Sequence, residues 1–171
     1  MLSRRPATDE YGSFCAGYIA RVPDGEWMAR LEAQPGEFRT ALAGVAAQRA
    51  AMPTTPGKWS LLDVLSHLSD TERVLSFRLM WFARGDASEL PGFDQDAWVA
   101  VLQGQPRTLD QLLDEFATVR AGTLALLRTV PQAAADRRGL ANGSPITVRA
   151  LAWVIAGHAQ HHLDALRDMA L

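Results

Sequence analysis

The chain has 171 residues, which suits a single domain, and 48% of them are hydrophobic, so it can bury a sizeable core. Its net charge is -2, and no basic cluster predicts a nucleic acid or a membrane surface as partner. The single cysteine, Cys15, excludes an intrachain disulfide and a cysteine-based zinc cluster. No stretch approaches the roughly 20 apolar residues of a membrane span or resembles a secretory signal, so we expect a cytoplasmic protein.

The first part of the chain predicts a flexible N-terminal arm over residues 1–14, with residues 15–171 forming one domain. A helical region follows over residues 25–52, with Asp24 as a candidate N-cap. Pro35-Gly36 should interrupt it, giving a short helix and then a longer one whose apolar residues face the core. A Pro- and Gly-rich turn occupies residues 53–57.

The second helix should start at Ser60, with Asp63 completing a capping box, and should end near Gly85. Its core-facing stripe alternates steps of four and three residues, as in a bundle helix. The stripe consists of Leu61, Leu65, Leu68, Glu72, Leu75, Leu79 and Phe82. A long connection over residues 85–107 follows, with a short helix at 94–102, and such connections often form a lid or a pocket wall.

The third helix begins with a Thr108–Gln111 capping box and is closed by Pro131. Its apolar stripe contains Arg120, and we predict that Arg120 pairs with Glu72 across the bundle; head groups more than about 6 Å apart would contradict the pairing. A second long connection leads to a last helix from about Thr147 to the end of the chain. No segment alternates with period two, so the fold class is all-α with four main helices.

Three of the four histidines lie within residues 158–162. His158 and His162 are four residues apart and continue the apolar face of the last helix, so both should point into the core. An unpaired polar ring there costs about 1–3 kcal/mol, so either backbone carbonyls or a shared metal ion must satisfy the pair. His67, in the middle of the second helix, can face them. The metalloprotease motif does not apply, because its glutamate is absent.

Four segments together resemble the DinB/YfiT-like superfamily of metal-dependent enzymes. They are residues 57–60 (GKWS), 66–73 (SHLSDTER), 90–96 (LPGFDQD) and 156–162 (AGHAQHH). The order and spacing of these segments are specific, and the resemblance covers about residues 18–171. It implies a four-helix bundle with up-down-down-up topology, and usually a homodimer.

The resemblance also implies a metal site made of His67, His158 and His162. The metal in this superfamily varies, with zinc and nickel both seen, and its known activities include thiol-dependent transfer and isomerisation. The name hydrolase is attached to some members by inference. Three imidazoles leave a coordination position open, as in a catalytic site, so the nucleophile would be a metal-bound water or a low-molecular-weight thiol. We therefore expect a thiol S-transferase-like or hydrolase-like enzyme acting on a small molecule.

Two alternatives stay open. One is a non-catalytic metal-binding or stress-associated protein, and the other is a structural bundle whose histidines coincide by chance. His161 should flank the site, either in solvent or as a supporting donor. Asp63 or Asp70 could accept a hydrogen bond from the second ring nitrogen of His67, although both also suit a solvated helix face.

Further candidates for the pocket lie beyond these histidines. Arg78 could meet an anionic group of the substrate, or could extend its charge to the surface from the end of its helix. Asp94, Asp96 and Trp98, in the long connection, are candidates for the pocket mouth.

Overall fold

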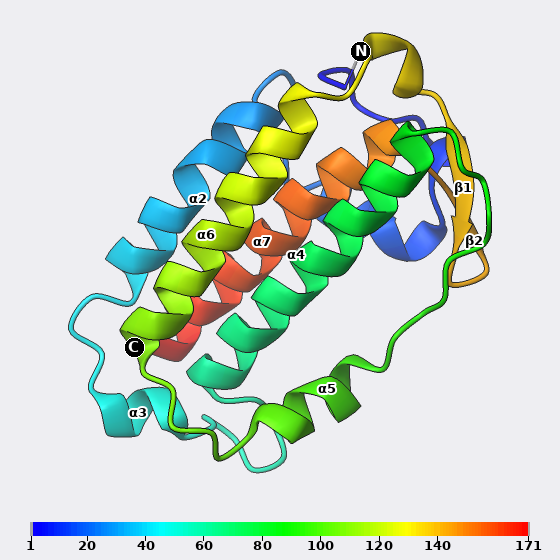
Figure 1. Cartoon of the computed structure of the whole chain (residues 1–171). Coiled ribbons are helices and arrows are strands. Elements are labelled where there is room, and N and C mark those ends of the chain that lie inside the picture. The colour runs from blue at the N-terminus through cyan, green and yellow to red at the C-terminus, as the bar shows by residue number, and fades with distance from the viewer. Residues whose placement is uncertain (1, 171) are drawn as a thin grey trace.

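The computed structural model describes residues 2–170, and four long helices make up most of it (Figure 1). They are α2 (Trp27–Ala41), α4 (Leu61–Ala83), α6 (Leu109–Arg128) and α7 (Val148–Ala170). Each of α4 and α2 packs against both α6 and α7, which gives the four-helix bundle that the sequence predicts. No helix among the described residues is long and apolar enough to span a membrane.

The chain directions in Figure 1 give an up-down-down-up order, in which the consecutive helices α4 and α6 are parallel. Parallel neighbours require a connection that returns along the whole bundle. Residues 84–108 make this return, and they contain the short helix α5 (Gln95–Leu102), which Asp94 caps with its side chain. The long connection predicted from the sequence is therefore a topological necessity of this bundle.

Side-chain caps fix where the long helices begin. The Ser60 hydroxyl accepts from the Asp63 amide while the Asp63 carboxylate accepts from the Ser60 amide, and Thr108 and Gln111 do the same for α6. The Thr147 hydroxyl accepts from the Ala150 amide at the start of α7. These three starts confirm the predicted ones.

The prediction that Pro35-Gly36 divides the first helical region is wrong, because α2 runs through Pro35. Proline has no N–H, so the Leu31 carbonyl loses its helical donor. The Arg120 guanidinium on α6 donates to that carbonyl at 2.8 Å. Asp24 is not the cap either: α2 starts after Glu26, and Asp24 pairs with Arg5.

Several small elements add to the bundle. They are η1 (Thr8–Glu10), η2 (Ser13–Cys15), α1 (Ala16–Ile19), α3 (Ala47–Ala51), η3 (Gln132–Ala134), β1 (Arg138–Ala141) and β2 (Ser144–Thr147). The two strands form an antiparallel hairpin whose turn, Asn142-Gly143, has positive φ at both residues. Leu90 adds a bridge to Ala141, which fixes the long connection to the hairpin.

The N-terminal segment, predicted as a flexible arm, makes specific contacts with the bundle. The buried Glu10 carboxylate accepts from Thr147 and Arg149 at the start of α7, and Arg5 donates to the carbonyls of Ile19 and Val22. The flexibility of residues 1–14 and the extent of the domain stay predictions.

A polar layer divides the core into two apolar clusters. One cluster lies around Leu79, Phe82 and Trp153, and the other lies around Phe38, Leu65 and Phe116. The polar layer consists of Gln34, Glu72, Arg120 and His158, one residue from each long helix and all buried.

The predicted Glu72–Arg120 pair is confirmed within this layer by two hydrogen bonds of 2.7 Å. Arg120 also donates to Gln34 at 2.7 Å, and Gln34 donates to the Ala156 carbonyl at 2.8 Å. Arg120 thus connects α6 directly to α4 and α2, and through Gln34 to α7.

Candidate metal centre

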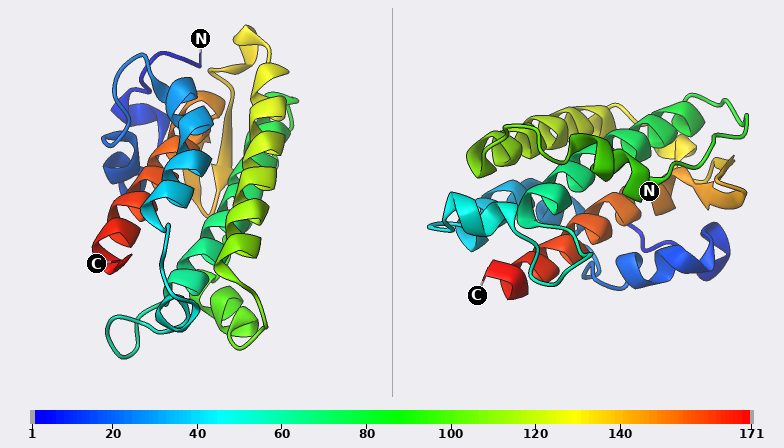
Figure 2. Two further views of the ribbon diagram at one scale, coloured as in Figure 1. Left: turned by 90° about the vertical axis from the view of Figure 1, so that its left-hand side faces the viewer. Right: turned by 90° about the horizontal axis from the view of Figure 1, so that it is seen from below.

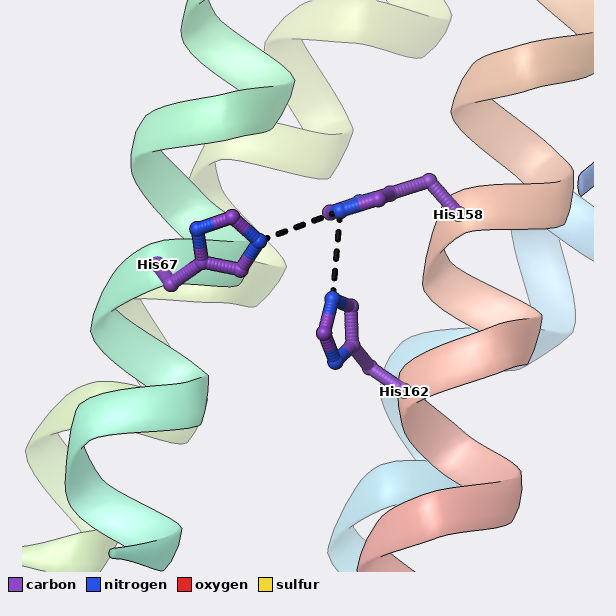
Figure 3. A group of neighbouring side chains, drawn as sticks. All are labelled: His67, His158 and His162. Carbon is purple, nitrogen blue, oxygen red and sulfur yellow. Dashed lines mark hydrogen bonds between the residues drawn. The ribbon is translucent and has the colours of Figure 1, made fainter. Parts of the chain in front are cut away.

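The rings of three histidines point toward one another between α4 and α7 (Figure 3), and one of them, His158, belongs to the polar layer. His67 comes from α4, and His158 and His162 come from successive turns of α7. The Nε2 atom of His158 lies 3.2 Å from Nε2 of His67 and 3.1 Å from Nε2 of His162. One nitrogen from each ring fits within a 4.8 Å group, and among the described residues this is the set of side chains suited to a metal ion.

Two of the three separations between these nitrogens fit a metal ion, and the third is at most 4.8 Å. Zinc–nitrogen bonds of about 2.0–2.1 Å in a tetrahedron place ligand nitrogens about 3.3–3.4 Å apart, close to the two observed separations. Hydrogen bonds between the rings fit less well. The Nε2 atom of His158 contacts two other nitrogens, but a nitrogen of a neutral imidazole carries either one proton or one lone pair, which suits one good hydrogen bond. A shared cation satisfies all three lone pairs at once.

Burial keeps the three rings neutral, which is the form that coordinates a metal. Burial lowers the pKa of His67 from 6.5 to about 4, and the pKa of His162 to about 3. Burial and then the neighbouring imidazoles hold the pKa of His158 well below its usual range.

The Thr71 hydroxyl, one helical turn from His67, lies 3.3 Å from Nδ1 and 3.5 Å from Nε2 of its ring. An oxygen at nearly equal distances from both nitrogens is far from the line of an N–H bond, so Thr71 touches the ring without selecting which nitrogen carries the proton. Neither proposed carboxylate contacts the ring. Asp63 completes the capping box of α4, and Asp70 pairs with Arg73.

Two aromatic residues that the sequence did not mark as site residues pack against the histidines. The ring centroid of Tyr18 lies 5.3 Å from that of His158, and the Trp59 centroid lies 4.8 Å from that of His67. Tyr18 approaches α7 because Gly157 has no side chain: a Cβ there would lie 2.0 Å from the Tyr18 carbonyl oxygen. His161 lies to the side, where its ring packs edge-on against Tyr18 and His162.

A cavity of about 960 Å³ lies beside the site: none of the three histidines lines it, but Trp59, whose ring packs on His67, does. Lys58 and Asp96 also line it, so its wall carries side chains of both charges. The negative charge of Asp96 also acts on His67, where it partly counters the lowering of the pKa by burial. Asp96 is therefore a pocket residue, as the sequence suggested.

The other candidates from the sequence lie elsewhere. Asp94 caps α5, while Arg78 and Trp98 line a separate cavity that none of the three histidines borders. The long connection thus contributes to two cavities.

Comparison with known proteins adds a family model and three relatives. The model of the DinB superfamily matches residues 18–166. A protein named putative metal-dependent hydrolase from Geobacillus kaustophilus is 26% identical over 141 residues, which cover 80% of this chain and 78% of the relative. A protein of the same description from Geobacillus thermodenitrificans is 24% identical over 163 residues, covering 92% and 90%.

The structure of YfiT from Bacillus subtilis, described as a probable metal-dependent hydrolase with an unusual four-helix bundle topology, superposes with a TM-score of 0.76. Its sequence identity is 19%, and the match covers 84% of this chain and 83% of YfiT. This likeness supports the bundle and its topology.

Proposed function

Because the chain belongs to the DinB superfamily, we propose that it is a metal-dependent enzyme that acts on a small molecule at His67, His158 and His162. The observation that carries the proposal is the convergence of three Nε2 atoms, with two separations of 3.1 and 3.2 Å, from rings that burial keeps neutral. The names of the two Geobacillus relatives agree with a metal-dependent reaction.

The donor set suits zinc or nickel. Imidazole nitrogen binds both metals, and a three-histidine set without a carboxylate is not the iron triad of two histidines and one carboxylate. A divalent ion held there would supply Lewis-acid chemistry, lowering the pKa of a water or thiol that it coordinates.

The protein's own residues would prepare the site for this chemistry. Thr71, Trp59 and Tyr18 pack against the imidazoles, and the two aromatic rings would shield them from water. Asp96 and Lys58, on the wall of the adjoining cavity, would orient a polar substrate through groups of either charge.

Between the two reactions, we favour transfer of a low-molecular-weight thiol to an electrophile over hydrolysis. Among the described residues, no carboxylate joins the three-histidine group, and Asp96 is the acidic residue whose charge acts on His67 from outside it, so no general base for water stands among the ligands. A thiol needs less help than water, because it is by itself much the stronger acid. Hydrolysis is the second candidate, since it is the activity that the relatives' names state.

Elemental analysis of the purified protein tests the site first. We expect about one equivalent of zinc or nickel, lost in His67→Ala and kept in His161→Ala, because the His161 ring lies outside the convergent group. Unchanged metal content in His67→Ala would show that the assigned ligands are wrong.

A substrate panel then separates the activities. Metal-loaded protein is assayed with thiols and generic electrophiles, and in parallel with ester and amide substrates. Turnover that requires both metal and thiol supports transfer, and thiol-independent turnover supports hydrolysis. If no substrate is turned over and removal of the metal lowers the melting temperature, the protein is a non-catalytic metal-binding protein.

A further inference from the structure

Arg78 is a buried cation without an acidic partner among residues 2–170. It lies on α4, three turns beyond His67, and is 8% exposed. The hydrogen bond that its guanidinium makes with the described residues goes from Nη2 to the Pro91 carbonyl at 2.6 Å. Burial lowers the pKa of Arg78, and the Cys15 thiol is the group whose charge would act in the opposite direction.

This arrangement contrasts with the other two deeply buried arginines. Arg120 pairs with Glu72, and Arg149 pairs with Glu10 and Asp136. For Arg78, the single hydrogen bond to Pro91 replaces only part of the hydration that a buried charge loses. Arg78 has four further N–H groups available to an acceptor of opposite charge.

The guanidinium borders a cavity of about 420 Å³ between α4 and the long connection, and Pro91, whose carbonyl it contacts, lines the same cavity. The aromatic rings of Phe77, Phe93 and Trp98 form much of the wall. The Phe93 and Trp98 centroids are 4.7 Å apart, and Trp98 is 43% exposed. The volume lies in the range of pockets for small organic ligands.

The walls of this cavity are held in place without a ligand. Leu90, which also lines it, exchanges backbone hydrogen bonds with β1 and the hairpin turn, and Arg78 itself holds Pro91. Asp70 is at the rim, but its carboxylate accepts from Arg73 at 3.0 Å, which offsets its repulsion of an anion. The cavity is thus fixed, mostly apolar, and supplied with one uncompensated positive charge.

We propose that this cavity is a second ligand site, which binds a small organic anion with a flat apolar body and one carboxylate. The carboxylate would accept hydrogen bonds from Arg78, and the apolar body would pack against the rings of Phe77, Phe93 and Trp98. Arg78 lies 11 residues beyond His67 on α4, about 16 Å along the helix axis, so the charge that would hold the carboxylate is distant from the candidate metal centre.

Calorimetric titration with 2-naphthoate and with its neutral analogue 2-naphthamide tests the proposal. We expect naphthoate to bind with a stoichiometry near one and about tenfold or more tighter than naphthamide, as a charge-assisted hydrogen bond warrants. Arg78→Met should reduce naphthoate binding to the level of naphthamide. Arg84→Met, at the exposed end of the same helix, should leave the preference intact.

The effect of metal on naphthoate binding distinguishes the second site from the candidate metal centre. Metal-loaded and chelator-treated protein should bind naphthoate equally well, even if the three histidines bind no metal at all. Binding that requires the metal would place the carboxylate at the histidines and overturn the second site. So would a failure to bind, or a preference for naphthoate that survives in Arg78→Met.

A measurement on the unmodified protein covers the case in which Arg78→Met does not fold. In nitrogen-15 NMR spectra, naphthoate should shift the indole N–H signal of Trp98 and leave that of Trp59, beside His67, in place. Shifts at Trp59 alone would contradict the proposal. A dimer could also hide the cavity. If sedimentation shows a dimer and naphthoate does not bind, the counter-charge of Arg78 would come from a second copy of the chain, and the proposal would be overturned.

Discussion

His67 shows how burial prepares a side chain for coordination. In water an imidazole is partly protonated near neutral pH, and a proton competes with a metal for the same lone pair. Burial removes this competition by lowering the pKa of His67 to about 4. The same lowering of the pKa makes the free energy of unfolding of the metal-free protein depend on pH.

We expect the metal-free protein to lose stability as the pH falls from 7 to 5. The unfolded chain, with a histidine pKa of 6.5, binds more protons than the folded chain below that pH, so stability is full above 6.5 and is lost toward pH 4. His67 alone contributes a loss of about 2 kcal/mol between pH 7 and 5. Urea unfolding of chelator-treated protein at several pH values measures it. His67→Phe should show a smaller pH dependence, and an equal one would contradict the assignment.

Thr71 offers a second test at the scale of one atom. Thr71→Val keeps the shape of the side chain and removes the hydroxyl that contacts both ring nitrogens of His67. We expect metal affinity to fall by up to about tenfold, less than for a hydrogen-bonded partner of a metal-binding histidine. Thr71→Ser should keep most of the affinity, and competition with a chromogenic chelator measures both. Equal affinities in the two variants would remove Thr71 from the site.

The sequence predicted the three histidines but not Thr71, Tyr18 or Trp59 as their neighbours. The i,i+4 spacing of His158 and His162 is visible in the sequence, because one helix determines it, whereas the third position rested on the family resemblance. The contact of Tyr18 depends on how α1 packs on α7, which no local pattern specifies. Thr71 lies one turn from His67 and could have been found by the same spacing rule.

At the scale of helices, α1 packs closely on α7 at Gly157. We expect Gly157→Ala to destabilise the protein by roughly 1–3 kcal/mol, because its Cβ would lie 2.0 Å from the Tyr18 carbonyl oxygen, a backbone atom. Gly122→Ala on α6 meets nothing within 4 Å and should instead stabilise by about 0.5–1 kcal/mol. Thermal unfolding compares the two. A neutral Gly157→Ala would show that α1 does not hold this position in solution.

The polar layer predicts an asymmetry between single and double substitutions. Arg120→Met leaves Glu72 buried without a partner and should cost about 3–5 kcal/mol. Adding Glu72→Leu removes that uncompensated charge, so the double variant should recover part of the loss. Chemical denaturation of the unmodified protein, the two single variants and the double variant measures this. A double variant as unstable as the sum of both single variants would show that the pair is not coupled.

Pro35 and Asn142-Gly143 show where local sequence rules succeed and fail. The proline rule predicted a break in α2, but Arg120, distant in the sequence, supplies the missing donor to Leu31. The Asn-Gly pair is a strong hairpin signal that a search for alternation in such short strands overlooks. Helix starts were predictable because capping boxes act within four residues, whereas the tolerance of Pro35 depends on tertiary structure.

At the scale of the whole molecule, Arg120 and Gln34 link all four long helices. We therefore expect the metal-free protein to unfold in one transition, with circular dichroism and tryptophan fluorescence coinciding. Trp153 lies in one apolar cluster and Trp59 packs against the other. Variants whose only tryptophan is Trp153 or Trp59 therefore report the unfolding of each half by fluorescence. Different midpoints for the two reporters would show that the halves unfold independently.

The division of the core by a polar layer also bears on which bundle this chain can form. If the helices contacted one another through apolar stripes alone, one helix could shift by a turn along its neighbour at little cost, because one leucine would take the place of another in the same groove. A slip of α6 against α4 or α2 would leave the guanidinium of Arg120 among hydrocarbon side chains, several ångströms from Glu72 and the Leu31 carbonyl. The layer therefore selects one helix register among many of similar apolar burial, and that same register brings the helix carrying His67 opposite the one carrying His158 and His162.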